Sequence, residues 1–209
     1  MMDYIKPDDI EARSFEIIQS ELPRPLDLAL APVIMRVIHT TADFEYVESL
    51  AFSEGVIEHA MAALRQGITI VSDTNMVKSG VDKSRLGSLG GEIHCFISDE
   101  DVAETARRDG ITRARVSVDK AAALGKPIIF AVGNAPTSLM RICELKESGE
   151  CDPVLVIGVP VGFVNVVESK EMLIRSGIPY ITARGRKGGS NVAAAICNAL
   201  LRIALANQN

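Results

Sequence analysis

Tryptophan is absent from the 209-residue chain, and aromatic residues together make up only 4% of it. Basic residues are also scarce relative to acidic ones, 22 against 27, so the formal net charge is −5. Proteins that bind nucleic acids usually carry a basic excess and aromatic side chains for base stacking. The composition therefore argues against a nucleic-acid partner.

Long hydrophobic runs are missing as well. No stretch reaches the roughly 18 uncharged apolar residues that a membrane span needs. The nearest stretch, residues 192–206, contains Asn198 and Arg202, which favours a buried amphipathic helix. The first residues lack the basic-then-apolar layout of a signal peptide. We therefore expect no membrane partner and a cytoplasmic location.

Metal-binding patterns are not found either. The four cysteines form no C-x-x-C pair, and the three histidines lack the spacing of metal ligands. Three of the cysteines lie in apolar surroundings, as reduced structural cysteines do. The sequence thus predicts no metal site and no disulfide framework.

Strand-like and helix-like segments alternate along most of the chain. Five runs rich in β-branched residues show no period-two alternation, which is typical of strands covered on both faces. We expect strands at 68–72, 93–97, 127–132, 154–159 and 179–182, and helices at 54–66, 99–108, 113–124, 136–148, 170–176 and 190–206, after a first fifty residues that are only helical. The pattern predicts one domain over residues 1–209, a three-layer α/β/α, Rossmann-like fold with a parallel five-stranded sheet.

Ligands of such sheets bind at the carboxyl ends of the strands. The segment 184–191 follows the last strand and combines glycines with three cations, of which Arg184 is the first, so it is either an anion site or an ordinary helix start capped by Ser190. In the segment 133–137, Asn134 and Thr137 either contact a ligand or cap the next helix. These segments are the first places to look for binding residues.

Two further candidates lie in the N-terminal helices. His39 closes an apolar helical stretch with Arg36 one turn before it, where the helix dipole favours an imidazolium that could act as a general acid. Capping or packing is the alternative for a lone histidine. Ser14 lies on the apolar face of the first helix, where its hydroxyl either bonds a carbonyl one turn back or faces a ligand. No G-x-S-x-G elbow supports hydrolase chemistry.

Several strings, taken in order, resemble the precorrin-8X methylmutase family. They are ARSFEII at 12–18, RVIH at 36–39, GNAPT at 133–137, GVPVGFV at 158–164 with ESK at 168–170, and RGR with GGS within 184–190. Each string is weak alone, but the ordered set is specific and the resemblance runs from about residue 4 to residue 201.

The resemblance implies an isomerase of cobalamin biosynthesis that moves a methyl group from C-11 to C-12 of a corrin precursor. The substrate would be precorrin-8X or cobalt-precorrin-8, and the product hydrogenobyrinic or cobyrinic acid. The family's histidine matches His39, and its substrate contacts match Ser14, Arg36 and Arg113. The resemblance also implies a corrinoid partner, a homodimer with its site near the interface, and no cofactor.

Two alternatives share the binding features of an isomerase. A corrinoid carrier would bind the ring without changing it, and only turnover separates the two. A nucleotide- or phosphate-using transferase is compatible with a parallel sheet by fold analogy alone. The residues after His39, Thr40 to Asp43, match some members of the family and not others, which leaves the cobalt question open.

Overall fold

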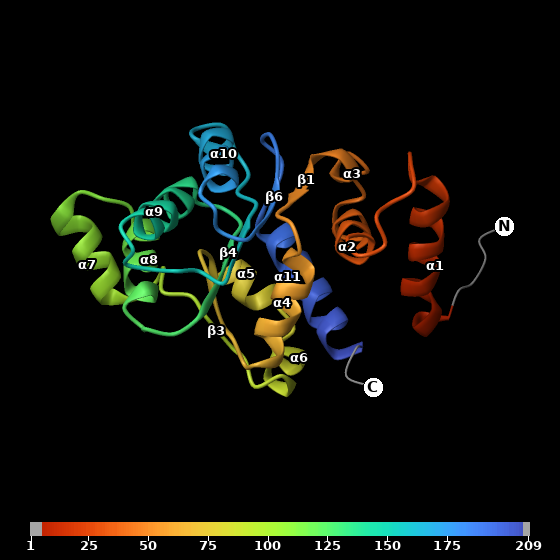
Figure 1. Ribbon diagram of the computed structural model, residues 1–209, viewed down its shortest axis with the longest axis horizontal. Helices are drawn as coiled ribbons and strands as arrows, with labels where there is room; N and C mark the ends of the chain where they lie inside the picture. Colours follow the sequence, from red (N-terminus) through yellow and green to blue (C-terminus); the bar gives the residue numbers. More distant parts are fainter. Residues whose placement is uncertain (1–5, 207–209) are drawn as a thin grey trace.

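The computed structural model describes residues 6–206, which fold into helices around a central sheet (Figure 1). In the described part of the chain the sheet has six strands in the order β1-β6-β5-β4-β2-β3. The strands are β1 Leu50–Phe52, β2 Thr69–Ser72, β3 Glu92–His94, β4 Ile128–Val132, β5 Leu155–Gly158 and β6 Tyr180–Ala183.

The prediction of five parallel strands was therefore wrong in one respect. Strands β2 to β6 run parallel, but β1 adds a sixth strand that pairs antiparallel with β6 at the sheet edge. Three residues are too few to show a periodicity, and only their pairing with β6, through Leu50 opposite Ala183, makes them a strand. The sheet is mixed, not purely parallel.

Helices cover both faces of the sheet because successive strand residues point to opposite sides. In β4, Ile129 and Ala131 join one apolar core, whereas Phe130 and Val132 join the other. The first core includes α2 (Ala31–Thr41), α4 (Val56–Arg65) and α11 (Ser190–Ala206), and the second includes α8 (Arg113–Ala122), α9 (Pro136–Glu147) and α10 (Val166–Arg175). Because both faces are buried, the sequences of these strands are continuous apolar runs.

The helices follow the predicted alternation, with two short additions after β2. Their bounds are α1 Pro7–Glu21, α2 Ala31–Thr41, α3 Tyr46–Ser49, α4 Val56–Arg65, α5 Asn75–Gly80, α6 Lys83–Ser88, α7 Glu100–Asp109, α8 Arg113–Ala122, α9 Pro136–Glu147, α10 Val166–Arg175 and α11 Ser190–Ala206. The segment after β2 was expected to be a loop, but Thr74 accepts a hydrogen bond from the Val77 amide and starts α5.

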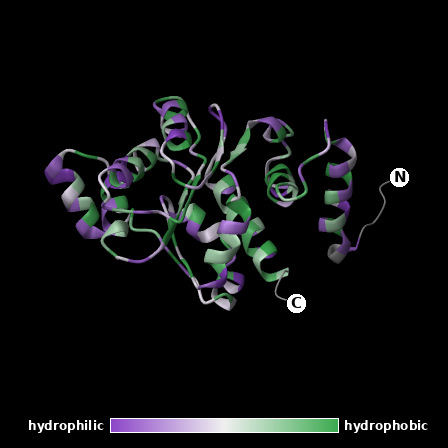
Figure 2. Cartoon of the chain, viewed as in Figure 1, coloured by the Kyte–Doolittle hydropathy of each residue, from purple (hydrophilic) through white to green (hydrophobic). Residues whose placement is uncertain are grey.

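Helix α11 organises the first face. It packs against α2, α4 and α5, and Figure 2 shows it as a largely hydrophobic helix near the middle of the molecule. Within residues 6–206, no helix is both long and apolar enough to cross a membrane. The burial of α11 confirms its interpretation as an amphipathic core helix.

Candidate active site

Helices α1 and α2 bring the predicted histidine and arginine together around an aromatic ring. Val33, Ile34, Val37 and Ile38 bury one face of α2, so Arg36 and His39 turn toward α1. The His39 ring stacks on Phe15 with centroids 5.2 Å apart and planes 10° apart. The Arg36 Cζ lies 4.6 Å from the centre of the same ring. Phe15 thus holds His39 and Arg36 in fixed positions.

Ser14 lies beside this group but its hydroxyl is engaged. Its Oγ donates to the Ile10 carbonyl at 2.8 Å, the local bond expected of a serine within a helix. The side chain is half-buried. A contact between Ser14 and substrate stays a prediction, and it would require this hydroxyl to rotate or to accept a second hydrogen bond.

The second group of predicted residues gathers where α8 and α9 begin. Thr112 caps α8, just before the exposed Arg113, and its Oγ1 donates to the Thr137 Oγ1 at 3.0 Å. Asn134 is exposed and does not cap α9, because the N-cap position belongs to Ala135. Figure 1 shows α8 and α9 toward one end of the molecule and α1 and α2 toward the other. These predicted residues thus lie in two groups, and Arg184, which pairs with Glu171 on α10, belongs to neither.

The backbone amides of the turn after β4 already bind a carboxylate of the protein. The buried Asp73 carboxylate accepts hydrogen bonds from the amides of Gly133, Asn134 and Ala135, at 2.9, 2.8 and 2.7 Å. Burial raises the pKa of Asp73, while these three donors oppose the shift. Asp73 was not among the predicted residues. Because it uses these amides, only the side chains of this turn remain for a ligand.

Most cations of the segment 184–191 are also occupied. Arg184 pairs with Glu171 at 2.8 Å, and Lys187 pairs with Asp43 at 2.6 Å. The hydrogen bond from Lys187 lowers the pKa of Asp43. Arg186 lies over the Phe163 ring, with 5.3 Å between its Cζ and the ring centre. A substrate contact of Arg184 stays a prediction, whereas the Lys187 pair ties this loop to the end of α2.

Beneath the loop lies a lysine that no sequence argument singled out. The Lys170 side chain is fully buried, and its Nζ donates to the carbonyls of Gly185 at 2.9 Å and Lys187 at 2.8 Å. Burial lowers the pKa of Lys170 to about 8. A long polar side chain on α10 thus fixes the loop from below. Lys170 lies within the string ESK that carries the family resemblance, but nothing in that string indicates that its side chain is buried.

The low pKa of Lys170 gives a testable dependence of stability on pH. Between about pH 8 and the ordinary lysine pKa, the unfolded chain holds a proton that the folded chain has released. Stability from this group therefore rises with pH across that window, by up to about 3 kcal/mol. Urea unfolding at pH 7 and pH 10 isolates this contribution as a difference, because the raised thiol pKa values of Cys143 and Cys197 lower stability over the same range in every variant. The stability of the unchanged protein relative to Lys170→Met should increase between the two pH values.

Lys126→Met is the matched control, because Lys126 is exposed and pairs with Glu92 at the surface. Its stability should change between the two pH values by the same amount as that of the unchanged protein. An equal pH dependence in Lys170→Met and the unchanged protein would show that the amine of Lys170 titrates normally.

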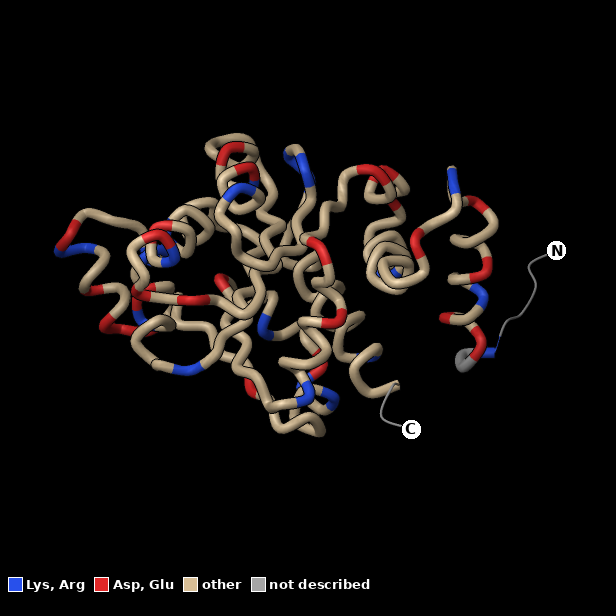
Figure 3. The backbone as a smooth tube through the Cα atoms, in the orientation of Figure 1, with Lys and Arg blue, Asp and Glu red and all other residues tan. Residues whose placement is uncertain are grey.

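One cavity adjoins the α2 residues. It has a volume of about 500 Å³ and lies between α2, the α5–α6 segment and α11, with Arg36 and Thr40 in its wall. A larger depression of about 890 Å³ is lined by Gly67, Gly90 and Pro127, at the amino ends of the strands. Ligands of parallel sheets bind at the opposite edge, which argues against the larger depression. The smaller cavity is the better candidate because Arg36, a predicted binding residue, lies in its wall. Figure 3 shows acidic and basic residues intermixed along the chain.

Polar residues of α11 in this wall were missed as site residues. Asn191, Asn198 and Arg202 are spaced by seven and then four residues, which places them on one face of the helix. In the sequence these residues interrupt an apolar run. Their position on one helix face was the pattern that could have indicated a polar wall. Within residues 6–206, no group of three or more His, Cys, Asp or Glu is arranged to hold a metal ion.

The fold and the site together define a class of protein. It is an α/β protein in which a histidine lies next to an arginine that lines a cavity, and the arginines of this cavity could bind a ligand with carboxylates. The sequence profile of the precorrin-8X methylmutase family matches residues 9–203. The chain belongs to that family, which confirms the resemblance found in its strings. Methylmutases are isomerases, and the chain is therefore an enzyme of this class, in cobalamin biosynthesis.

Curated relatives cover nearly the whole chain. It is 46% identical to the cobalt-precorrin-8 methylmutase of Priestia megaterium, over 94% of this chain and 88% of the relative. Identity to the cobalt-precorrin-8 methylmutase of Salmonella typhimurium is 48%, over 96% and 97%. Identity to the precorrin-8X methylmutase of Pseudomonas aeruginosa is 39%, over 96% and 98%.

A solved structure has the same fold. The precorrin-8X methylmutase of Thermus thermophilus superposes with a TM-score of 0.88 at 36% sequence identity, covering 96% of this chain and 100% of that one. The six-stranded arrangement is thus similar to that of a methylmutase along its full length.

Proposed function

We propose that the chain moves a methyl group from C-11 to C-12 of precorrin-8X or of its cobalt form. The observation that carries this proposal is the α1–α2 contact, where Phe15 packs against both His39 and Arg36, and Arg36 also lines an arginine-rich cavity. A corrin precursor is a conjugated ring edged with carboxylates. The site offers such a ring an aromatic side chain, cations and a proton donor.

His39 is the general acid of this proposal. An intramolecular methyl shift needs no external nucleophile. The protein therefore has to withdraw electron density from the ring and hold the ring in a reactive geometry. In precorrin-8X, a proton or hydrogen bond given to a ring nitrogen draws electrons away from the path of migration. In the cobalt form the nitrogens are bound to the metal, so His39 contributes there only by holding the ring. His39 is exposed at the C-terminal end of α2, so its ring is accessible to a ligand.

The names of the relatives favour the cobalt form as substrate. Two cobalt-precorrin-8 methylmutases are 46% and 48% identical to the chain, while others, at 39% and 38%, are as similar to it as the precorrin-8X enzyme at 39%. Measuring kcat/KM with both rings under anaerobic conditions tests this choice. A higher value for cobalt-precorrin-8 supports it, a higher value for precorrin-8X reverses it, and binding without turnover of either ring would indicate a carrier.

We further propose that two copies of the chain complete one site. His39 and Arg113 lie in different groups, on helices that cover opposite faces of the sheet. Large apolar side chains are exposed near both α1 and the loop after β5, among them Ile10, Ile17 and Phe163. Exposed apolar surface of this kind favours association. In a homodimer, Arg113 of one copy would face His39 of the other.

The proposal also includes a cytoplasmic location. All four cysteines are free, and three of them are buried. Free buried thiols are typical of a reducing compartment.

A further inference from the structure

The cavity beside α2 has a wall rich in arginine and a floor of small residues. Gly80, Ala194 and Ala195 form the floor, where α5 and α11 pack so closely that a Cβ on Gly80 would lie 2.8 Å from the Cβ of Ala194. Three guanidinium groups stand around it, on Arg36, Arg85 and Arg202. Small floor residues leave room for a ligand, and three cations determine its charge.

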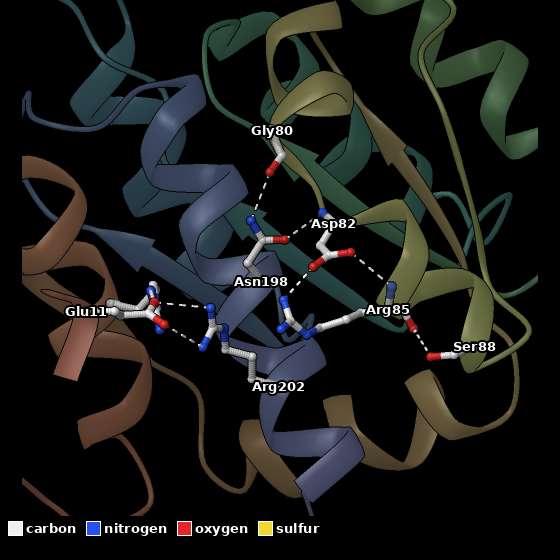
Figure 4. A network of polar contacts seen from close by, with 8 residues as sticks. Glu11, Gly80, Asp82, Arg85, Ser88, Asn198 and Arg202 are labelled. Carbon is white, nitrogen blue, oxygen red and sulfur yellow. Dashed lines mark hydrogen bonds and ion pairs between the residues drawn. The ribbon is translucent and has the colours of Figure 1, made fainter. Parts of the chain in front are cut away.

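Two acids neutralise these arginines, and they are held very differently. Asp82 caps α6, accepts from the Arg85 side chain at 2.5 Å, and its amide donates to the Asn198 Oδ1 at 2.8 Å. Figure 4 shows this set as a closed network between α6 and α11. Asp82 and Arg85 are therefore fixed parts of the cavity wall.

Glu11 reaches the cavity from outside. It comes from α1, which packs chiefly against α2, and its side chain remains 44% exposed. Arg202 holds its carboxylate with two nitrogens, at 3.2 and 3.1 Å, and Arg36 donates to the same group. The hydrogen bond from Arg36 is the largest factor that lowers the pKa of Glu11. Figure 4 shows Arg202 extended toward Glu11 and away from the Asp82 network.

We propose that Glu11 occupies the binding place of a substrate carboxylate, and that Arg202, together with Arg36, binds that carboxylate when the ring enters. The inference rests on the proposed function and names one subsite for it. Replacing one carboxylate by another preserves both the charge and the forked hydrogen bonds of the arginines. The exchange therefore costs little, and Glu11 keeps the arginines oriented in the empty enzyme.

The position of the subsite relates it to the chemistry. Thr40 lines the same cavity and directly follows His39, while Arg36 lies one turn earlier on α2. A carboxylate bound by Arg36 and Arg202 brings the attached edge of the ring next to His39. Arg202 thus selects and orients the ring without taking part in the methyl shift.

The alternative role for these contacts is a simple tether that fastens α1 to the rest of the protein. The two roles predict opposite signs for one substitution. If Glu11 competes with substrate, Glu11→Gln frees two arginines and tightens binding. If Glu11 is a tether, Glu11→Gln and Arg202→Met both loosen α1 and both weaken binding.

Steady-state kinetics of the full chain with its corrin substrate separates these roles. We expect Glu11→Gln to lower KM about threefold or more, and Arg202→Met to raise it about tenfold or more, with kcat changed less than threefold in both. Arg202→Lys should lie between, because it keeps the charge and loses the fork. Glu48→Gln is the control, since Glu48 forms an exposed pair with Arg24 and its loss changes the net charge equally.

A rise of KM in both Glu11→Gln and Arg202→Met would overturn the inference, and so would an unchanged KM in Arg202→Met. Urea unfolding of each variant identifies any that fails to fold, in which case Arg202→Lys carries the comparison. The proposed function fails separately, and only when the unchanged protein itself turns over no corrin substrate.

Discussion

Replacing His39 with alanine is expected to lower kcat for precorrin-8X by about 100- to 10,000-fold, the usual contribution of a positioned general acid. Binding of the ring should change little, because Arg36 and Phe15 remain in place around the vacated position. The measurement is a turnover assay followed by the visible spectrum, with a parallel titration of the product to obtain its Kd. His39→Ala should thus separate catalysis from binding.

The control for this experiment is His59→Ala, because His59 is exposed on α4 and lies outside both groups of candidate residues. Its kcat should equal that of the unchanged protein. The loss in His39→Ala should be smaller with cobalt-precorrin-8, whose ring nitrogens bind cobalt and cannot take up a proton. A kcat near that of the unchanged protein in His39→Ala, with precorrin-8X, would remove His39 from the mechanism.

The second large effect concerns the dimer. His39→Ala and Arg113→Ala are each expected to be nearly inactive alone, while a mixed dimer of the two should regain about half of the activity of the unchanged dimer. One of its two sites then contains both intact residues, and the other contains neither. Co-expressing the variants with different tags and purifying through both tags gives the mixed dimer directly.

A mixed dimer of His39→Ala with Arg36→Ala provides the control. Both residues lie in the same group on α2, so neither site is repaired and no activity should return. Failure of the first pair to regain activity would show that His39 and Arg113 serve one site within a single copy, or that Arg113 serves none. A monomeric protein in solution would contradict the proposal at once.

The sequence predicted strands β2 to β6 because both of their faces are buried, which leaves unbroken apolar runs such as Ile128–Val132. It did not predict β1, whose three residues acquire their strand geometry from pairing with β6. The short α5 and α6 were missed for a related reason. Six residues make fewer than two helical turns, and the caps Thr74 and Asp82 are the only local signals.

The candidate site divides in the same way. His39, Arg36 and Ser14 could be predicted because a helix end and a family string mark them. Phe15 and Glu11 could not, since their importance arises from the packing of α1 on α2. Arg202 is separated from Glu11 by 191 residues, and a local sequence pattern cannot predict a contact over that separation.

Buried polar groups were the hardest to foresee. Asp73 and Lys170 are both buried, and each satisfies backbone groups of a distant turn. From the sequence, those turns were either ligand sites, because free amides and cations favour anions, or ordinary helix starts. The structure shows that buried side chains already bind backbone groups of these turns: Asp73 accepts from the amides after β4, and Lys170 donates to carbonyls of the last loop. Arg184 and the turn at Asn134 are consequently less open than the sequence suggested.

The most direct test of the isomerase follows one labelled methyl group. Substrate that carries ¹³C in the C-11 methyl group is incubated anaerobically with a small amount of protein, and the product is examined by ¹³C NMR. We predict that the label appears at C-12, in many product molecules for each protein molecule and without any methyl donor. A label that stays at C-11 while the ring is bound would contradict it.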